Sequence, residues 1–404
     1  MTIEFSTYYT LILAVVVLLI GKLMVRRIRL LREFNIPEPV AGGLVAALVA
    51  YGINLATGYR PAFDSSLQTA FMLCFFSSIG LSANFAKLRA GGSALVVFLL
   101  VIVVFVFVQN GVGVALASLL GLDPLIGLIA GSITLLGGHG TAGAWGAVLE
   151  EQHGIVGAMT IGMACATFGL IIGGLVGGPM AKWLIQRHQS EGGTGHDDNV
   201  TVDGSTPNFE FPHEQRLITA DAAIETLALF AGCLAFAQFM TQITQGTAVQ
   251  LPTFVWALGG GVLIRNTLDY AFGFTVFDRA IDVFGNAALS IYLAIALLSL
   301  KLWELAGLAG PLVIILAVQT VVLAAYVAFV TFRVMGKNYD AAVLCAGQCG
   351  FGMGATPTAV ANMQAITNQY GASHKAFLIV PMVGAFFIDL VNAVVLQLFI
   401  KVVG

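Results

Sequence analysis

The chain has 404 residues, of which 58% are apolar and only 10% are charged. A soluble globule with this balance could not cover its surface with polar side chains, so the composition excludes an ordinary soluble protein and predicts a polytopic membrane protein. The formal net charge of −3 is too small to indicate a nucleic-acid partner.

Ten apolar stretches approach the length of about 20 residues that a helix needs to cross roughly 30 Å of hydrocarbon. We expect spans at 8–25, 38–56, 66–84, 93–119 and 157–183, and then at 217–241, 251–265, 281–300, 311–332 and 376–399. The first stretch is interpreted as a retained span and not as a secretory signal, because its basic residues follow the apolar run.

The basic residues are unevenly distributed between the two sides of the predicted membrane. The cluster from Lys22 to Arg32 places the end of the first span in the cytoplasm by the positive-inside rule. With ten spans, fifteen of the eighteen Lys and Arg residues fall in cytoplasmic segments, and Arg60, Lys301 and Lys401 fall outside. Both termini are therefore predicted to lie on the non-cytoplasmic side.

A polar segment at 186–216 separates five spans from the other five. It contains several glycines and more acidic than basic residues, which is typical of a flexible linker. Its histidines have no fixed scaffold and are given no role. The chain is thus predicted to consist of a first half at 1–185, a flexible cytoplasmic linker, and a second half at 217–404.

The two halves resemble each other at a nearly constant lag. Asp123 corresponds to Asp340 after 217 residues, and Gly138 corresponds to Gly354 after 216. Single matches arise by chance in Ala- and Gly-rich sequence, but the shared order of spans favours a repeat. Because each half has an odd number of spans, the second half would cross in the opposite orientation. The predicted fold class is an all-α polytopic membrane protein, an inverted repeat of two five-helix halves.

Two glycine-rich segments, at about 123–145 and 340–363, interrupt the pattern of spans. Glycine costs about 1 kcal/mol per helix position relative to Ala, so neither segment should cross as one continuous helix. Their apolar arms indicate re-entrant hairpins, the first entering from outside and the second from the cytoplasm, with tips that meet near the midplane. Close helix packing is the alternative for such glycines, and it explains Gly173, Gly174, Gly177 and Gly178.

Irregular backbone at membrane depth leaves N–H and C=O groups that a ligand can pair with. Helix N-termini favour a carboxylate, whereas carbonyl and hydroxyl oxygens suit sodium. These residues predict a symporter of a small anionic solute. The candidates for binding the solute are Gly137, Gly138, His139, Gly140, Thr141, Gly354, Ala355, Thr356, Pro357, Thr358, Asn362 and Asp389. The candidates for binding sodium are Ser132, Thr134, Gln348, Gly352, Thr358 and Asp389.

Three ionisable residues have both a functional and a structural interpretation. Asp389 lies near the middle of the last span, one turn before Asn392, and could meet a cation or an ammonium group or could be a hydrogen-bonded structural acid. His139 could donate to a solute carboxylate or could be a structural hairpin histidine. For Glu225 in the sixth span, a packing or interface role is favoured.

Four long motifs resemble those of the glutamate:sodium symporter family, and the resemblance spans nearly the whole chain. The motifs are IPEPVAGG from Ile36, SITLLGGHGTAGAW from Ser132, MGKNYDAAVLCAGQCGFGMGATPTAVANMQAIT from Met335 and VPMVGAFFIDLVNA from Val380. The resemblance implies sodium-driven L-glutamate uptake across the bacterial inner membrane, with periplasmic termini and with both hairpins forming the binding sites. It also implies a homodimer of the elevator type, in which the hairpins and the fifth and tenth spans move against a scaffold. Sodium is the expected coupling ion, with no other cofactor.

The sequence leaves three other functions open. A dicarboxylate or 2-hydroxycarboxylate symporter would share inverted halves with glycine-rich loops. An intramembrane enzyme would need a metal cluster, for which His139, Glu150 and Glu151 are conceivable ligands, but zinc sites need three or four ligands at defined spacing. A channel would lack uphill accumulation. We expect no enzymatic activity.

Overall fold

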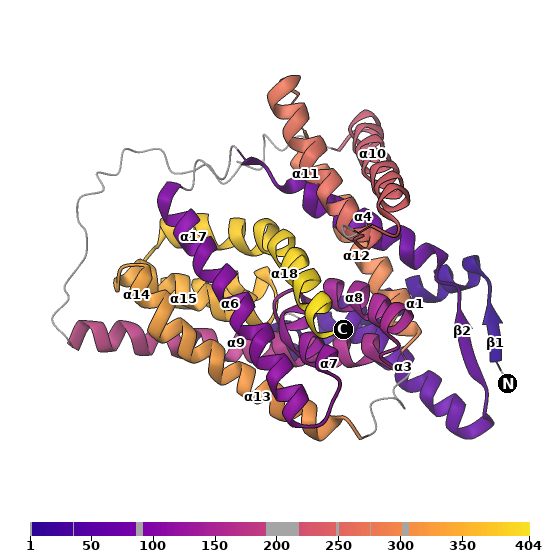
Figure 1. The fold of residues 1–404 in the computed structure, drawn as a ribbon, viewed down its shortest axis with the longest axis horizontal. Helices are drawn as coiled ribbons and strands as arrows, with labels where there is room; N and C mark the ends of the chain where they lie inside the picture. Colours follow the sequence, from indigo (N-terminus) through magenta and orange to yellow (C-terminus); the bar gives the residue numbers. More distant parts are fainter. Residues whose placement is uncertain are drawn as a thin grey trace.

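The structure is a computed structural model that describes residues 2–34, 36–85, 92–190, 218–247, 250–274, 276–300 and 307–404. Most of the predicted linker lies outside the described residues; its first residues, 186–190, continue the preceding helix. Nearly all of the described chain is helical (Figure 1).

The first half begins with the strand β1 (Thr2–Phe5) and contains a second strand, β2 (Arg60–Phe63). Its helices are α1 (Thr7–Arg27), α2 (Arg29–Glu33), α3 (Glu38–Thr57), α4 (Ser66–Ser82), α6 (Gly92–Leu119), α7 (Pro124–Leu128), the π-helical turn η1 (Ile129–Ile133), α8 (Gly138–His153) and α9 (Ala158–Ser190).

In the second half, every element formed by the described residues is a helix. They are α10 (Ala220–Thr244), α11 (Thr253–Ala271), α12 (Asp278–Leu298), α13 (Ala309–Tyr326), the π-helical turn η3 (Val327–Thr331), α14 (Phe332–Val334), α15 (Tyr339–Met353), α16 (Thr356–Tyr370), α17 (His374–Met382), the π-helical turn η4 (Val383–Phe387) and α18 (Ile388–Val403).

Each of the ten predicted spans coincides with a helix or with a helical run. Within the described residues, seven are long and apolar enough to cross a membrane: α1, α3, α6, α9, α10, α12 and the run from α13 to α14. Of the other three, α4 is apolar but has 17 residues, α11 carries Arg265 and Asp269, and the last run is divided by η4. The chain is a polytopic membrane protein.

A small parallel sheet, absent from the sequence prediction, joins the chain start to the segment before α4. Strand β1 pairs with β2, and the ring of Phe5 stacks on Phe63 at 5.3 Å. The Thr7 hydroxyl donates to the Asp64 carboxylate at 2.6 Å. Hydrogen bonds from Ser66 and Thr7 hold the pKa of Asp64 below its ordinary value. The sheet therefore ties the start of α1 to the end of α3.

The helices pack as two groups, which lie on opposite sides of the view in Figure 1. The flank group comprises α1, α3, α4, α10, α11 and α12, in which α4 packs on both α11 and α12 and α3 packs on α12. The hairpin group comprises α6 to α9 and α13 to α18, in which α9 packs on α15 and α16, and α6 packs on α7, α13 and α18. Helix α8 also reaches α12, so the groups are in contact.

Packing pairs in one half have counterparts in the other. Helix α1 packs on α3 as α10 packs on α11, and α1 packs on α12 as α10 packs on α4. Helix α12 packs on α3 as α4 packs on α11. In the hairpin group, α8 packs on α9 as α16 packs on α17, and α9 packs on α15 as α18 packs on α7. The two halves thus share both element order and contacts.

Glycine sets the close approach of helices in the flank group. A Cβ added at Gly42 would lie 2.0 Å from the Val17 carbonyl oxygen, and one at Gly80 would lie 2.1 Å from the Leu258 carbonyl oxygen. Both distances are shorter than real Cβ contacts, so only glycine lets these backbones meet. In a membrane, such packing supplies attraction that the hydrophobic effect does not.

A buried ion pair fixes the ends of α4, α11 and α12 relative to one another. Arg265 is only 4% exposed. Its Nε donates to Asp269 at 2.9 Å, and its guanidinium also contacts Asp278 and the Leu81 carbonyl. Because breaking a buried pair leaves an uncompensated charge, this corner of the flank group is held in one arrangement.

Candidate functional site

The segment of the first predicted hairpin forms two helical arms with a break between them, and the second arm is longer than expected. Helix α7 begins with Pro124, and the Asp123 carboxylate caps it by accepting from the Leu125 backbone N–H at 2.8 Å. The descending arm ends as η1, inside which Gly131 departs from helical geometry. The chain then turns, and α8 returns as far as His153 rather than Trp145. Gly138 has φ of +66°, a conformation that side-chain-bearing residues rarely adopt.

The segment of the second predicted hairpin likewise forms two helices with a break between them, and again the second arm exceeds the predicted bounds. Helix α15 ends at Met353, the chain is non-helical at Gly354 and Ala355, and α16 runs from Thr356 to Tyr370. Pro357 occupies the first turn of α16, where a missing N–H costs nothing. Each hairpin therefore presents the N-terminus of a helix at its break.

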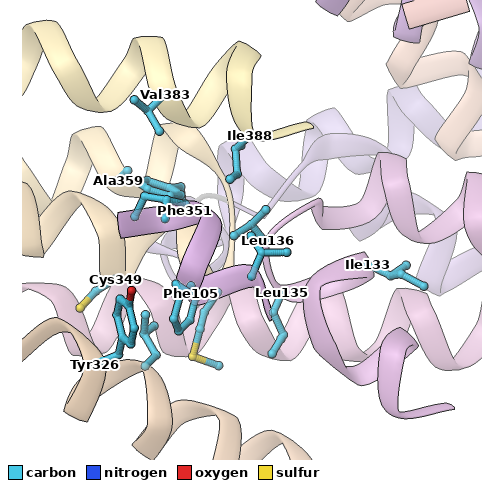
Figure 2. Packing of buried hydrophobic residues seen from close by; sticks show 14 of the residues in the cluster. Phe105, Ile133, Leu135, Leu136, Tyr326, Cys349, Phe351, Ala359, Val383 and Ile388 are labelled. Carbon is cyan, nitrogen blue, oxygen red and sulfur yellow. The ribbon is translucent and has the colours of Figure 1, made fainter. Parts of the chain in front are cut away.

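The two breaks are in contact. A Cβ added at Gly138 would lie 3.2 Å from the carbonyl oxygen of Gly354, so the hairpin tips approach to van der Waals distance. Figure 2 shows the apolar setting of this region, where Leu135 and Leu136 of the first break lie near Phe105 and Phe351. The N-termini of α8 and α16 consequently lie next to each other. The first N–H groups of a helix have no partner within the helix, and the helix dipole adds a favourable potential for an anion there.

Amide side chains satisfy the irregular backbone of the first hairpin. The Ser132 backbone N–H donates to Asn110 Oδ1 at 3.0 Å, and Asn392 Nδ2 donates to the Ser132 carbonyl at 3.1 Å. The Ser132 hydroxyl donates to Asn392 Oδ1 at 2.6 Å. Sequence reasoning did not include Asn110 or Asn392 among the site residues. Their signal is a polar side chain in a mostly apolar span, where Asn110 follows Gln109 and Asn392 follows Asp389 by one turn.

The second hairpin receives a similar contact. Gln109 Nε2 donates to the Gly352 carbonyl at 3.1 Å, and Gln319 Nε2 donates to the Gln109 carbonyl at 2.7 Å. Asn362 donates to the carbonyls of Gly173 and Ala346 at 2.9 and 3.3 Å. The amide nitrogen of Asn362 is thus used to join α16 to α9 and α15. These bonds hold the hairpin arms in register.

Two predicted residues keep buried polar atoms without a partner among the described residues. Both side-chain polar atoms of Gln348 and the hydroxyl of Thr358 are in this state, and the residues are 0% and 1% exposed. A buried unpaired polar group costs about 1–3 kcal/mol. These two are therefore the predicted candidates best suited to accept a ligand. By contrast, the Thr134 hydroxyl donates to the Ile129 carbonyl at 2.6 Å.

His139 is buried at the start of α8, and its contact favours the structural interpretation. Its Nε2 lies 3.0 Å from the Thr167 hydroxyl, which itself donates to the Met163 carbonyl at 2.8 Å. Because the single hydroxyl proton of Thr167 is used there, Nε2 is the donor of the pair. In the neutral ring Nδ1 then lacks a proton and cannot donate to a carboxylate.

The neighbours of His139 pack closely against other elements. The hydroxyl of Tyr292, which is 0% exposed, donates to the Gly140 carbonyl at 3.0 Å. A Cβ added at Gly143 would lie 2.2 Å from that hydroxyl, so the absence of a side chain at Gly143 makes room for it. Thr141 packs over Gly137. Tyr292 was not predicted from the sequence, since a tyrosine in a span carries no sign of its partner.

The remaining candidate site residues lie at the tip of the second hairpin and in the last helix, α18. Thr356 is half-buried at the tip of the second hairpin, and Pro357 is exposed. Asp389 is half-buried in the first turn of α18 and makes no hydrogen bond or ion pair within the described part of the chain. On this helix Asn392, one turn later, is the residue that contacts the first hairpin.

The expected packing role of the fifth-span glycines is found at two positions. A Cβ at Gly177 would lie 2.1 Å from the Asn362 amide, and one at Gly173 would lie 3.1 Å from the Cys349 carbonyl. A Cβ at Gly174 would make an ordinary contact with Thr358, whereas one at Gly178 would have no atom of the described residues within 4 Å. Helix α9 therefore uses glycine to seat the second hairpin.

The conceivable metal cluster is not formed. Among the described residues, no group of three His, Cys, Asp or Glu side chains is placed to hold a metal ion. Glu150 accepts a hydrogen bond from the Met159 backbone N–H at 2.9 Å, and His139 is engaged with Thr167.

Comparisons with known proteins agree with the motif resemblance. A family profile described as sodium/glutamate symporter matches residues 3–372. The sodium/glutamate symporter of Haemophilus influenzae is 53% identical over 404 residues, which is 100% of this chain and 99% of that relative. The sodium/glutamate symporters of Escherichia coli and Shigella flexneri are each 52% identical over 395 residues, which is 98% of this chain and 97% of the relative. The chain belongs to the sodium/glutamate symporter family.

Proposed function

We propose that this protein is a sodium-coupled symporter that takes up L-glutamate across the bacterial inner membrane, with both termini in the periplasm. Sodium coupling and glutamate as the solute follow from the family and from relatives that match over their whole length. The observation in the structure that carries the proposal is the contact between the two helix breaks, Gly138 against Gly354, at the centre of the hairpin group. The same membership makes the chain a transporter rather than an enzyme.

The two halves form an inverted repeat in this proposal. Support comes from the shared order of elements and from the matched packing pairs, such as α3 on α12 and α4 on α11. Hairpins from opposite membrane sides would then end at one shared site. Such an arrangement suits alternating access, because a small movement can open the site to either side.

The helix N-termini of α8 and α16 are the proposed sites for the glutamate carboxylates. Their unpaired N–H groups and the positive end of each helix dipole favour an anion. Gln348 and Thr358 are the proposed side-chain ligands of sodium, because their buried oxygens have no partner among the described residues. Asp389 remains a candidate for the ammonium group or for sodium, since it is half-buried one turn from Asn392.

An elevator-like movement of the hairpin group against the flank group is proposed for alternating access. The boundary between the groups is largely apolar: Trp145 of α8 packs edge-on against Phe254 of α11 at 5.4 Å, and Met163 and Leu170 of α9 pack in a cluster with α3 and α12. Apolar contacts are non-directional and can be exchanged during sliding. The hydrogen bond from Tyr292 to Gly140 crosses this boundary.

A homodimer is proposed, with the outer face of α10 covered by a second copy. This face exposes Ile224 (64%) and Leu227 (53%), and Glu225 is exposed beside them. A charge facing hydrocarbon costs about 2.5 kcal/mol or more at mid-helix, so contact with protein is favoured over contact with lipid.

The proposed function predicts sodium-dependent accumulation of L-glutamate in proteoliposomes that contain the purified protein. Under an inward sodium gradient, internal glutamate is expected to rise above the equilibrium level. This excess over equilibrium is expected to vanish when sodium is equal on both sides. Radiolabelled glutamate, citrate and malate would be compared. Uptake of citrate or malate without glutamate would replace the proposal by the 2-hydroxycarboxylate or dicarboxylate alternative, and glutamate flux without accumulation would indicate a channel.

Removing the unpartnered hydroxyl of Thr358 is expected to weaken sodium binding. Thr358→Val and Gln348→Leu should each raise the sodium concentration for half-maximal uptake about tenfold, because each variant removes a polar group that contacts a charged ligand. Thr331→Val is the matched control, because it removes another buried hydroxyl without a described partner that lies in η3, outside the hairpins. Equal sodium dependence in all three variants would remove Thr358 and Gln348 from the site.

The Tyr292 hydrogen bond is expected to stabilise this arrangement of the two groups. Tyr292→Phe keeps the ring in place but removes the hydrogen bond. A loss of about 1 kcal/mol corresponds to a fivefold lower population of this arrangement of the two groups relative to others. Distances between spin labels on α10 and α9 would report that shift. Tyr326→Phe is the control, since its hydroxyl donates to the Val101 carbonyl at 2.7 Å within the hairpin group. If the distance between the labels on α10 and α9 in the protein with Tyr292 unchanged has a single value that is the same with and without sodium and glutamate, the elevator-like movement is contradicted.

The proposed dimer predicts a protein mass of two chains for the protein purified in mild detergent, measured by light scattering with the detergent subtracted. A protein mass of 42.4 kDa, which is that of one chain, would contradict the dimer if it is found at concentrations that retain transport activity.

A further inference from the structure

A basic cavity of about 220 Å³ lies between the end of α9 and the segment from η3 to the turn after α14. Three of its lining residues are the cations Arg187, Arg333 and Lys337, and none of the lining residues that the structure describes carries a carboxylate. All three cations are exposed. The cavity is separate from the hairpin tips and has no part in the transport site described above.

Two of the cations are held by aromatic rings that also line the cavity. The guanidinium of Arg187 lies 5.4 Å from the ring centre of Trp183, and that of Arg333 lies 5.6 Å from the ring centre of Phe329. Stacking on a ring uses the face of a guanidinium and not its N–H edge, so the edge of Arg333 can meet an anion. The planar fork of each arginine suits a phosphate, which accepts two parallel hydrogen bonds.

The surroundings of the cavity are those of a membrane interface. Its three cations fall in predicted cytoplasmic segments, and its rings are partly exposed, Trp183 by 43% and Phe329 by 55%. Tryptophan side chains such as Trp183 gather at the boundary between hydrocarbon and water. Farther along the same two helical runs, Leu175 is 51% exposed and Val321 is 67% exposed. The same helical runs that line the cavity thus also carry exposed apolar residues.

We propose that this cavity binds the phosphate group of an anionic phospholipid of the cytoplasmic leaflet. Cation clusters between membrane helices on the cytoplasmic side attract anionic headgroups. The acyl chains would lie on the exposed apolar residues of α9 and α13, which a free phosphate could not use. The bound lipid would connect α9, which packs on the second hairpin, with α14, which leads into it.

The test measures lipid binding to the purified full-length protein. Phosphatidylglycerol or phosphatidylcholine with the same acyl chains would be added to delipidated protein in detergent, and the retained lipid and the thermal unfolding temperature would be measured. We expect phosphatidylglycerol to be retained and to raise the unfolding temperature, with phosphatidylcholine about tenfold weaker because it carries no net charge.

A matched pair of variants identifies the site. Arg333→Gln with Lys337→Gln should lower phosphatidylglycerol retention about tenfold or more. Arg279→Gln with Lys375→Gln removes the same charge from predicted cytoplasmic positions that do not line the cavity, and should retain the lipid. If the first double variant does not fold, the single variants Arg333→Gln and Lys337→Gln replace it.

Three results would overturn the proposal. Equal retention by both double variants would show general attraction to basic residues, and equal binding of phosphatidylcholine would show attraction to acyl chains alone. Stabilisation by inorganic phosphate to the same extent as by phosphatidylglycerol would identify a free anion as the ligand. None of these measurements depends on transport, so they stand apart from the test of the proposed symport.

Discussion

The constraint on which the rest of this structure depends is that no backbone N–H or C=O group can remain unpaired in hydrocarbon. Two hairpins break their helices inside the protein, and each break releases such groups. Amide side chains from neighbouring helices form hydrogen bonds with these groups: Asn110 and Asn392 pair with the backbone of Ser132, and Gln109 pairs with the carbonyl of Gly352. These amides are buried because their partners are buried.

Glycine makes this solution sterically possible. The hairpin tips meet at Gly138 and Gly354, and α9 approaches the second hairpin through Gly169 and Gly177, where a Cβ would lie 2.1 Å from the nearest atom in each case. Close backbone approach brings the ends of several helices into a small volume. Partial charges of both signs therefore gather at one place, which is the electrostatic requirement for binding an anion and a cation together.

The two helix groups differ in what holds them together. The flank group is fixed by glycine-mediated packing and by the buried contacts of Arg265 with Asp269 and Asp278. The boundary with the hairpin group consists mostly of apolar side chains, to which Tyr292 adds a directional bond. Directional contacts within each group and mainly non-directional contacts between them favour movement of the groups as bodies, as proposed here.

The sequence by itself indicated the apolar helices, the two helix breaks and the family, because hydropathy, glycine density and long motifs are local properties. It indicated Gln348 and Thr358 as polar residues in glycine-rich segments, but their lack of described partners is a property of the fold. The tertiary structure alone decided that Asn392 contacts the first hairpin, that His139 is engaged by Thr167, and that Tyr292 reaches Gly140. Each of these partners lies at least 28 residues away along the chain, and no local pattern encodes such a contact.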